Sequence, residues 1–234
     1  KVDLINEDLT YFELDAISAM GDNIYIFAEK EPEGDLFISE CTGTLKNTEL
    51  IIELFYINKR EDYFHFPQII IRLGNSKIEL NGNYQNNNNY SISGDIQNLE
   101  LNNLYSIIGK AFRINGLIDS ATIGIENNNN QLNPNPIYSA KINMKNGAID
   151  DIQFDSLYIW ALYSNRRLTL YSFELDTYLG NLNAKNGGQI SFGLTNSGID
   201  FQKDDSLDLF LTYENINIER FNRYLPWGYE SRGF

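Results

Sequence analysis

Apolar and polar residues alternate in short runs along residues 137–192, and each run ends at Asn, Gly or Asp. Alternation with a period of two is typical of β-strands that have one apolar and one polar face. The phrase Phe-Glu-Leu-Asp occurs at 12–15 and again at 173–176, and other phrases recur as well. The sequence therefore predicts a long sheet with a continuous apolar face. Such a face must be covered by a core, a partner or a lipid.

The composition narrows the classes of function. The hydrophobic fraction of 42% is that of a folded protein, and 234 residues suffice for a sizeable core. The formal net charge is −14. Phosphate binding needs clustered Lys and Arg, so this charge argues against nucleic acid as a partner. It also argues against adhesion to an anionic membrane surface by charge alone.

The residues that carry most catalytic and metal chemistry are scarce. Cys41 is the only cysteine and His65 is the only histidine, so an internal disulfide is excluded. Neither residue has neighbours in sequence that would form a catalytic or metal-binding group, and the chain has no phosphate loop and no nucleophile elbow. The pairs Asp150-Asp151 and Asp204-Asp205 lack the spacing of a calcium loop and are typical of turns. We expect no enzyme activity, no cofactor and no metal.

The ends of the chain indicate a piece of a larger protein. The chain opens at Lys1 directly into polar sequence and contains no apolar run of the length needed for a membrane-spanning helix. We expect residues 1–234 to be one repeat-built fragment without an internal domain boundary.

Strands account for most of the expected secondary structure. They are predicted over 10–17, 23–29, 35–45, 48–58, 66–73, 76–84, 90–98, 114–126, 137–145, 148–163, 166–176, 179–185, 188–195, 198–202 and 206–214. Two short helices are predicted near 101–110 and 216–225, where apolar residues fall at helical spacing before Gly109 and Pro226.

An internal repeat of about 117 residues relates 90–116 to 207–233. With this shift Asn98 aligns with Asn215, and Leu104 aligns with Phe221. Each unit reads as a strand, a short helix and the start of another strand.

Short phrases follow one another in a fixed order. They are Gly94-Asp95-Ile96, Leu99 to Ile108, Ile114-Asn115-Gly116-Leu117, Phe154-Asp155-Ser156-Leu157, Arg167-Leu168-Thr169-Leu170 and Gly187-Gly188-Gln189-Ile190. In this order they resemble the repeated phrases in the C-terminal region of the TamB branch of the AsmA-like superfamily. The resemblance covers residues 66–234 best. The Asn-rich loops and the many Tyr and Phe residues depart from that family, which often has small residues there.

The resemblance implies an all-β fold in which a long curved antiparallel sheet forms an open trough, called a β-taco. It implies the periplasmic portion of an inner-membrane-anchored protein in a diderm bacterium. The implied function is to bind and conduct phospholipid acyl chains between the inner and outer membranes, which supports outer-membrane biogenesis. A BamA-like or TamA-like outer-membrane barrel is the implied protein partner.

The physics of an alternating sheet is compatible with such a groove. Acyl chains would shield the apolar face at about 25 cal/mol per Å² of buried area, and they need no directional partners. The residues expected to face inward form one alternating set. They are Ile69, Ile71, Leu73, Ile78, Leu80, Ile92, Ile96, Ile142, Met144, Leu157, Ile159, Leu168, Leu170, Leu207, Leu209 and Leu211.

Other interpretations of the same alternation remain open. One is a scaffold or chaperone that pairs its sheet edge with strands of outer-membrane β-barrel proteins. A second is a transmembrane β-barrel, which also alternates and often ends in Phe, as this chain does at Phe234. A third is a carbohydrate-binding β-sandwich that uses its aromatic residues, and an ordinary sealed sandwich core would alternate in the same way.

Overall fold

The computed structural model describes residues 11–17, 23–30, 35–45, 48–60, 63–85, 89–101, 114–127, 136–184, 187–195, 198–200 and 202–215. Nearly all of them are in β-strands, and sixteen strands form one long antiparallel sheet. The all-β, antiparallel prediction is confirmed. The predicted helix at 216–225 lies outside the described residues, and so does the one at 101–110 except for Leu101, whose backbone is helical.

The strands are short in the first and last parts of the chain and long in the middle. They are β1 (Tyr11–Ile17), β2 (Asn23–Lys30), β3 (Leu36–Leu45), β4 (Thr48–Ile52), β5 (Phe55–Arg60), β6 (Tyr63–Leu73), β7 (Ser76–Gln85), β8 (Asn89–Glu100), β9 (Ile114–Asn127), β10 (Ile137–Ile149), β11 (Ile152–Ser164), β12 (Arg167–Thr177), β13 (Gly180–Asn183), β14 (Gly188–Ser191), β15 (Gly193–Thr195), β16 (Gly198–Asp200), β17 (Leu207–Leu209) and β18 (Thr212–Glu214).

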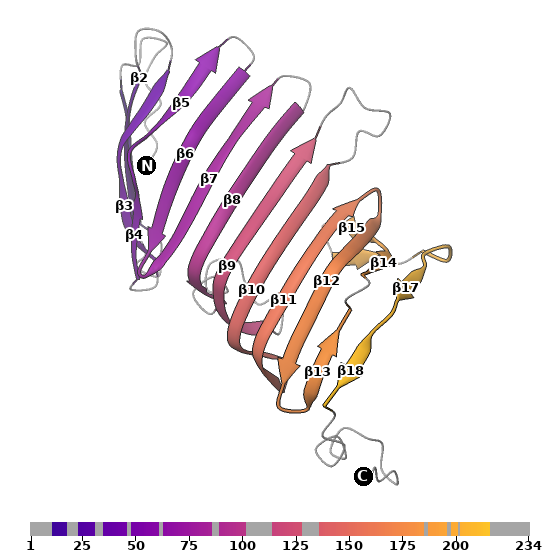
Figure 1. Cartoon of the computed structure of the whole chain (residues 1–234). Coiled ribbons are helices and arrows are strands. Elements are labelled where there is room, and N and C mark those ends of the chain that lie inside the picture. The colour runs from indigo at the N-terminus through magenta and orange to yellow at the C-terminus, as the bar shows by residue number, and fades with distance from the viewer. Residues whose placement is uncertain are drawn as a thin grey trace.

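The central part of the sheet is a meander in which each strand pairs with the next along the chain. From β6 to β12 the order in the sheet is the order in the sequence. Figure 1 shows these strands side by side as one continuous, twisted sheet. Tight turns join them. Asn165 and Arg166, for example, form the two-residue turn between β11 and β12 with φ of 50° and 62°. Two positive φ values match the right-handed twist of the flanking strands.

The predicted strand 48–58 is wrong in one respect, because it is two strands, β4 and β5, separated at Glu53 and Leu54. Both pair with β3 on one side and β6 on the other. Pro67 lies in the stretch of β6 opposite the interruption, and proline has no N–H to donate to a ladder.

A similar interruption occurs near the C-terminal edge. β13 and β14 both pair with β12, while β18 and β17 pair with them in turn. The predicted strand 206–214 is therefore two strands, and a separate two-stranded hairpin, β15–β16, connects β14 to β17. The predicted strand 148–163 is also corrected, since Asp150, with φ of 51°, forms the turn between β10 and β11.

Irregular residues line up across the central strands. Asn98 in β8 and Asn146 in β10 have φ of 54° and 49°, and Gly116 of β9 has φ of 131°. The β9–β10 ladder shifts register between Lys145 and Ala148. Bulges of this kind bend a strand and increase its twist. Figure 1 shows β9, β10 and β11 curving toward one end.

The two positions that the internal repeat aligns share an unusual conformation. Asn98 and Asn215 have φ of 54° and 56°. Asparagine tolerates this left-handed region better than most residues with a side chain. Asn98 lies two residues before the end of β8, and Asn215 directly follows β18.

Candidate functional site

One face of the sheet carries an unbroken row of apolar side chains. Residues directly opposite each other in an antiparallel ladder project to the same face. The registers connect, in order, Leu14, Ile26, Cys41, Ile52, Ile71, Ile78, Ile96, Ala121, Ile142, Ile159 and Phe173. We call the side of the sheet that carries this row the apolar face.

The sixteen residues expected from the sequence are distributed along this face. Those of β6, β7, β8, β10 and β11 belong to the row or alternate with its members. Leu168 and Leu170 lie opposite Tyr163 and Ala161, and Leu207 and Leu209 continue the same side through β14. Leu211 lies between β17 and β18, outside the paired positions.

Sequence reasoning missed about half of the apolar face. The omitted residues are those of β2 to β4, those of β9, and Phe173 and Leu175 of β12. Strict alternation from Leu170 would place Phe173 on the opposite face. The β11–β12 ladder shifts register between Trp160 and Ala161, and Leu170 and Phe173 therefore project to the same face. The alternation of Ile24, Ile26 and Ala28 was already visible and could have extended the set toward the N-terminus.

Most of the apolar face is only partly covered. Ile123 and Tyr138 are 36% and 37% exposed, and Leu207 is 71% exposed. Many other members, including Ile71, Ile92 and Ile142, are half-buried. The interior of a sealed core buries such side chains almost completely. In the described part of the chain, the apolar face therefore remains accessible over much of its length.

A packed core occupies the bend in the central strands. Its buried members come from four strands and from the residue after β8, and they are Leu99, Leu101, Ile118, Ala121, Met144, Phe154 and Leu157. Leu99 and Leu157 are each 2% exposed. The bulges allow this packing, because they bring Phe154 and Leu157, three residues apart, into one cluster. The bend thus holds the largest cluster of buried residues on the apolar face.

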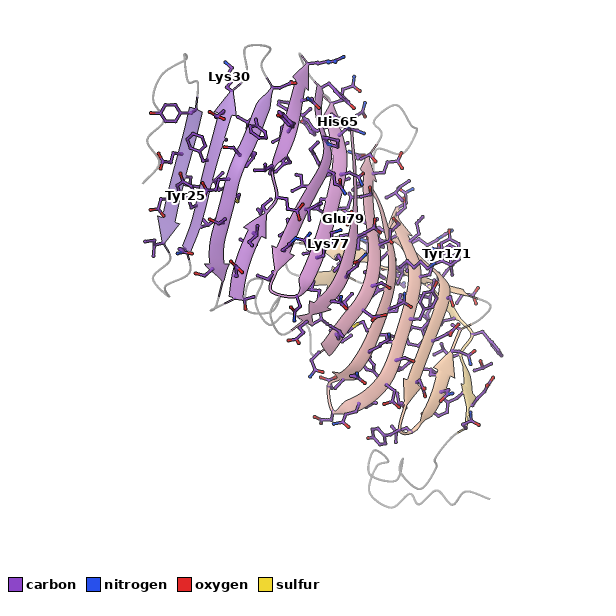
Figure 2. The ribbon with its side chains drawn as sticks, turned by 60° about the vertical axis from the view of Figure 1, so that its left-hand side comes forward. Tyr25, Lys30, His65, Lys77, Glu79 and Tyr171 are labelled. Carbon is purple, nitrogen blue, oxygen red and sulfur yellow. The ribbon has the colours of Figure 1, made fainter. Side chains whose placement is uncertain are left out.

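The opposite face, which we call the polar face, carries many paired charges, but it also holds aromatic side chains such as Trp160, which is 47% exposed and whose ring centroid is 4.9 Å from that of Tyr171. Arg72 Nη2 lies 2.6 Å from Glu53 Oε1, and Thr122 donates a hydrogen bond of 2.7 Å to Asp95. Figure 2 shows Lys77 and Glu79 projecting from neighbouring points of β7, where they form an ion pair. Hydrogen bonds from Lys77 and Gln68 lower the pKa of the Glu79 carboxyl below its usual value. These pairs keep this face hydrated while the other is apolar.

Cys41 and His65, the two residues considered for catalysis, make packing and hydrogen-bonding contacts. Cys41 is buried on the apolar face, and burial raises the pKa of its thiol, which disfavours the reactive thiolate. His65 Nδ1 donates to the carbonyl oxygen of Gly82 at 3.1 Å, and its ring stacks on Tyr63. Within the described ranges, no group of three or more His, Cys, Asp and Glu residues could hold a metal ion.

Comparison with known proteins found no match. No family model matches it, and no curated protein or solved structure is significantly similar to it. The described part of the chain contains no helix with the length and hydropathy of a membrane span. The described strands form one large sheet and one small hairpin, so the two packed sheets of a carbohydrate-binding sandwich are not found among them.

Proposed function

We propose that the apolar face binds and conducts phospholipid acyl chains, as a segment of a periplasmic TamB-like or AsmA-like protein that works between the inner and outer membranes. One observation carries this proposal. The apolar row crosses eleven consecutively paired strand positions from Leu14 to Phe173, and nine of its side chains are only partly buried. Exposing an apolar surface of this length to water is unfavourable, and covering it with hydrocarbon lowers the free energy.

A lipid conduit needs one surface that binds acyl chains and another that faces water, and the two faces of the sheet can provide them. Side chains on the apolar face offer no directional partner, so an acyl chain can slide along them without breaking hydrogen bonds. The polar face, with pairs such as Arg72–Glu53, keeps the protein hydrated. The curved, open trough expected from the TamB resemblance belongs to this proposal, since a curled sheet would surround an acyl chain on several sides.

Neighbouring residues of β9 provide a direct test. Ile123 lies on the apolar face and Thr122 on the polar face, and both residues are exposed. We expect a photo-reactive residue at 123 to crosslink phospholipid in cells, and one at 122 to crosslink little, with mass spectrometry of the adducts as the measurement. Equal yields at the two positions would contradict a lipid-bearing face.

The proposal also requires that the chain act without catalysis. We expect Cys41→Ala and His65→Ala to retain the crosslinking yield of the unaltered protein, because neither side chain has a reactive partner. Cys41→Ala should lower stability by about 1 kcal/mol, because a buried side chain is shortened. Thermal melting measured beside crosslinking separates the two effects. A variant that melts normally but no longer crosslinks lipid would contradict the non-enzymatic role.

A second candidate function is a scaffold for outer-membrane β-barrel proteins. The observation that favours it is the position of β1, which ends the strand order and pairs only with β2 among the described strands. An edge strand can accept a further strand through its free N–H and C=O groups. For this role, we expect a crosslinker at Glu13 to capture an unfolded barrel protein. We expect an Asp15→Pro substitution in the same strand to abolish this crosslinking, because proline cannot donate a hydrogen bond to an added strand.

A further inference from the structure

Aromatic side chains occupy the same position near the end of five strands. In β6, β7, β8, β10 and β11 the second residue from one end is aromatic, and these residues are Phe64, Tyr84, Tyr90, Tyr138 and Tyr163. The position is near the start of one strand and near the end of the next. Because neighbouring strands are antiparallel, all five residues lie at one end of the sheet. We call this set the aromatic rim.

The strand registers place the aromatic rim on the apolar face. Phe64 lies opposite Tyr84, which lies opposite Tyr90, and Tyr138 lies opposite Tyr163. Each tyrosine is an even number of positions from the member of the apolar row in its own strand, so both project to the same side. The rim is therefore one end of the surface that we propose for acyl chains.

The Phe192 ring extends the aromatic rim beyond β11. Phe192 directly follows β14, and its amide donates a hydrogen bond of 2.8 Å to the carbonyl oxygen of Arg166. Its ring stacks on that of Tyr163 with a centroid distance of 5.2 Å. The Tyr163 hydroxyl donates to the Phe192 carbonyl oxygen at 3.0 Å. The rim thus continues from β6 to the residue after β14.

The two ends of the central strands differ in chemistry. At the rim, Tyr84 and Tyr138 are 39% and 37% exposed, so they do not fill a sealed core. The cluster at the bend contains buried residues such as Leu99, Met144 and Leu157, and none of its described members is a tyrosine. Along the strands, the apolar face therefore changes from exposed rings with hydroxyl groups to buried hydrocarbon.

This change matches the polarity of a phospholipid. A tyrosine has an apolar ring and a polar tip, and it is favoured where hydrocarbon meets water. Its hydroxyl can donate a hydrogen bond to an ester or phosphate oxygen. The acyl chains accept no hydrogen bonds and are best covered by aliphatic side chains. A lipid placed with its ester groups at the rim satisfies both ends of the face.

The dimensions of the face agree with this placement. Tyr84 and Ile78 are six positions apart in β7, which corresponds to about 20 Å at a rise of about 3.3 Å per residue. The hydrocarbon of one bilayer leaflet is about 15 Å thick, half of the bilayer core. An acyl chain that begins at the rim and runs along a strand therefore ends near the apolar row.

We propose that the aromatic rim holds the glycerol and ester region of a bound phospholipid, with the acyl chains running along the strands toward the bend. This inference rests on the proposed function and adds the orientation of the lipid to it. Neighbouring lipids then lie side by side across the strands. They move along the sheet with all headgroups at the same edge.

Two photo-reactive forms of phosphatidylethanolamine test the orientation. One carries a diazirine on the headgroup amine and the other carries it at the end of an acyl chain. Each is offered to the 234-residue chain in phosphatidylcholine vesicles, and tandem mass spectrometry locates the adducts after photolysis. We expect the headgroup probe to label Tyr84 and Tyr138 at least about fivefold more than Ile96 and Ile142, an advantage equivalent to one net hydrogen bond. The acyl probe should show the reverse preference.

Removing hydroxyl groups from the rim tests its chemistry. Tyr84→Phe combined with Tyr138→Phe keeps both rings, so we expect an unchanged melting temperature. The preference of the headgroup probe for the rim should fall about fivefold. Tyr63→Phe is the matched control, because Tyr63 is also 37% exposed but lies on the polar face, where its ring stacks on His65. This control should leave the preference unchanged.

The outcomes separate the orientation from the proposed function. Acyl-probe adducts on the apolar face, with headgroup adducts spread equally between the rim and the apolar row, would overturn the orientation and leave the lipid function standing. An unchanged headgroup preference in the double variant would overturn the role of the tyrosine hydroxyls. If neither probe labels the apolar face above the polar face, the proposed function fails and the orientation fails with it.

Discussion

Leu157→Ala is expected to lower the free energy of unfolding by about 2–5 kcal/mol, as is usual when a fully buried leucine is truncated. Leu157 is 2% exposed in the core at the bend, where it packs with Met144 and Phe154. Removing its side chain leaves a cavity among residues from several strands. Urea unfolding monitored by circular dichroism measures the change. A loss below about 1 kcal/mol would show that the bend is not a packed core.

Leu207→Ala is the matched control for this prediction. It is the same substitution on the same face, but Leu207 is 71% exposed. We expect a change within about 0.5 kcal/mol, because little apolar area is buried there. The contrast between the two variants tests the division of the apolar face into a packed bend and an accessible remainder.

Ile123→Asp is expected to abolish lipid crosslinking while the chain stays folded. Ile123 is 36% exposed on the apolar face, so water can hydrate a carboxylate there. An acyl chain that passed this position would have to strip water from the charge, at a cost of several kcal/mol. Leu170 is a poor site for the same experiment, because it is buried against Ala161 and Ala184 and a charge there should unfold the protein.

Gln97→Asp serves as the control for charge. Gln97 is exposed on the polar face, directly opposite Lys77, so a new carboxylate has a favourable neighbour. We expect this variant to keep both its melting temperature and its lipid crosslinking, measured with the probe at another apolar position such as Ile92. Equal loss of crosslinking in the two variants would show that net charge, and not the apolar face, controls lipid binding.

The strands and their two faces could be predicted because the physical signal is local. Alternation with period two depends only on the direction of successive side chains. For this reason the set from Ile69 to Leu209 falls on one side of the sheet. Turns could be placed for the same reason, since Asn and Gly at positive φ are needed wherever the chain reverses.

The bulges and interruptions could not be predicted, because they depend on the partner strand. The shift between Trp160 and Ala161 brings Phe173 to the apolar face, and nothing near Phe173 in the sequence indicates it. The interruption opposite Pro67 likewise becomes visible only when β4, β5 and β6 are side by side. A register error of one residue reverses the direction of every later side chain, so local patterns lose their meaning beyond a bulge.

The sequence by itself determined that this chain is an antiparallel sheet with one apolar and one polar face, since both properties follow from the alternation of adjacent residues. Only the tertiary structure decided which apolar residues are sealed and which are accessible. Leu157 and Ile123 look alike in the sequence, but the aligned bulges collect the first into a core and leave the second exposed. The ion pair between Arg166 and Asp205 was also decided there, because a contact across 39 positions depends on the path of the chain between the two residues.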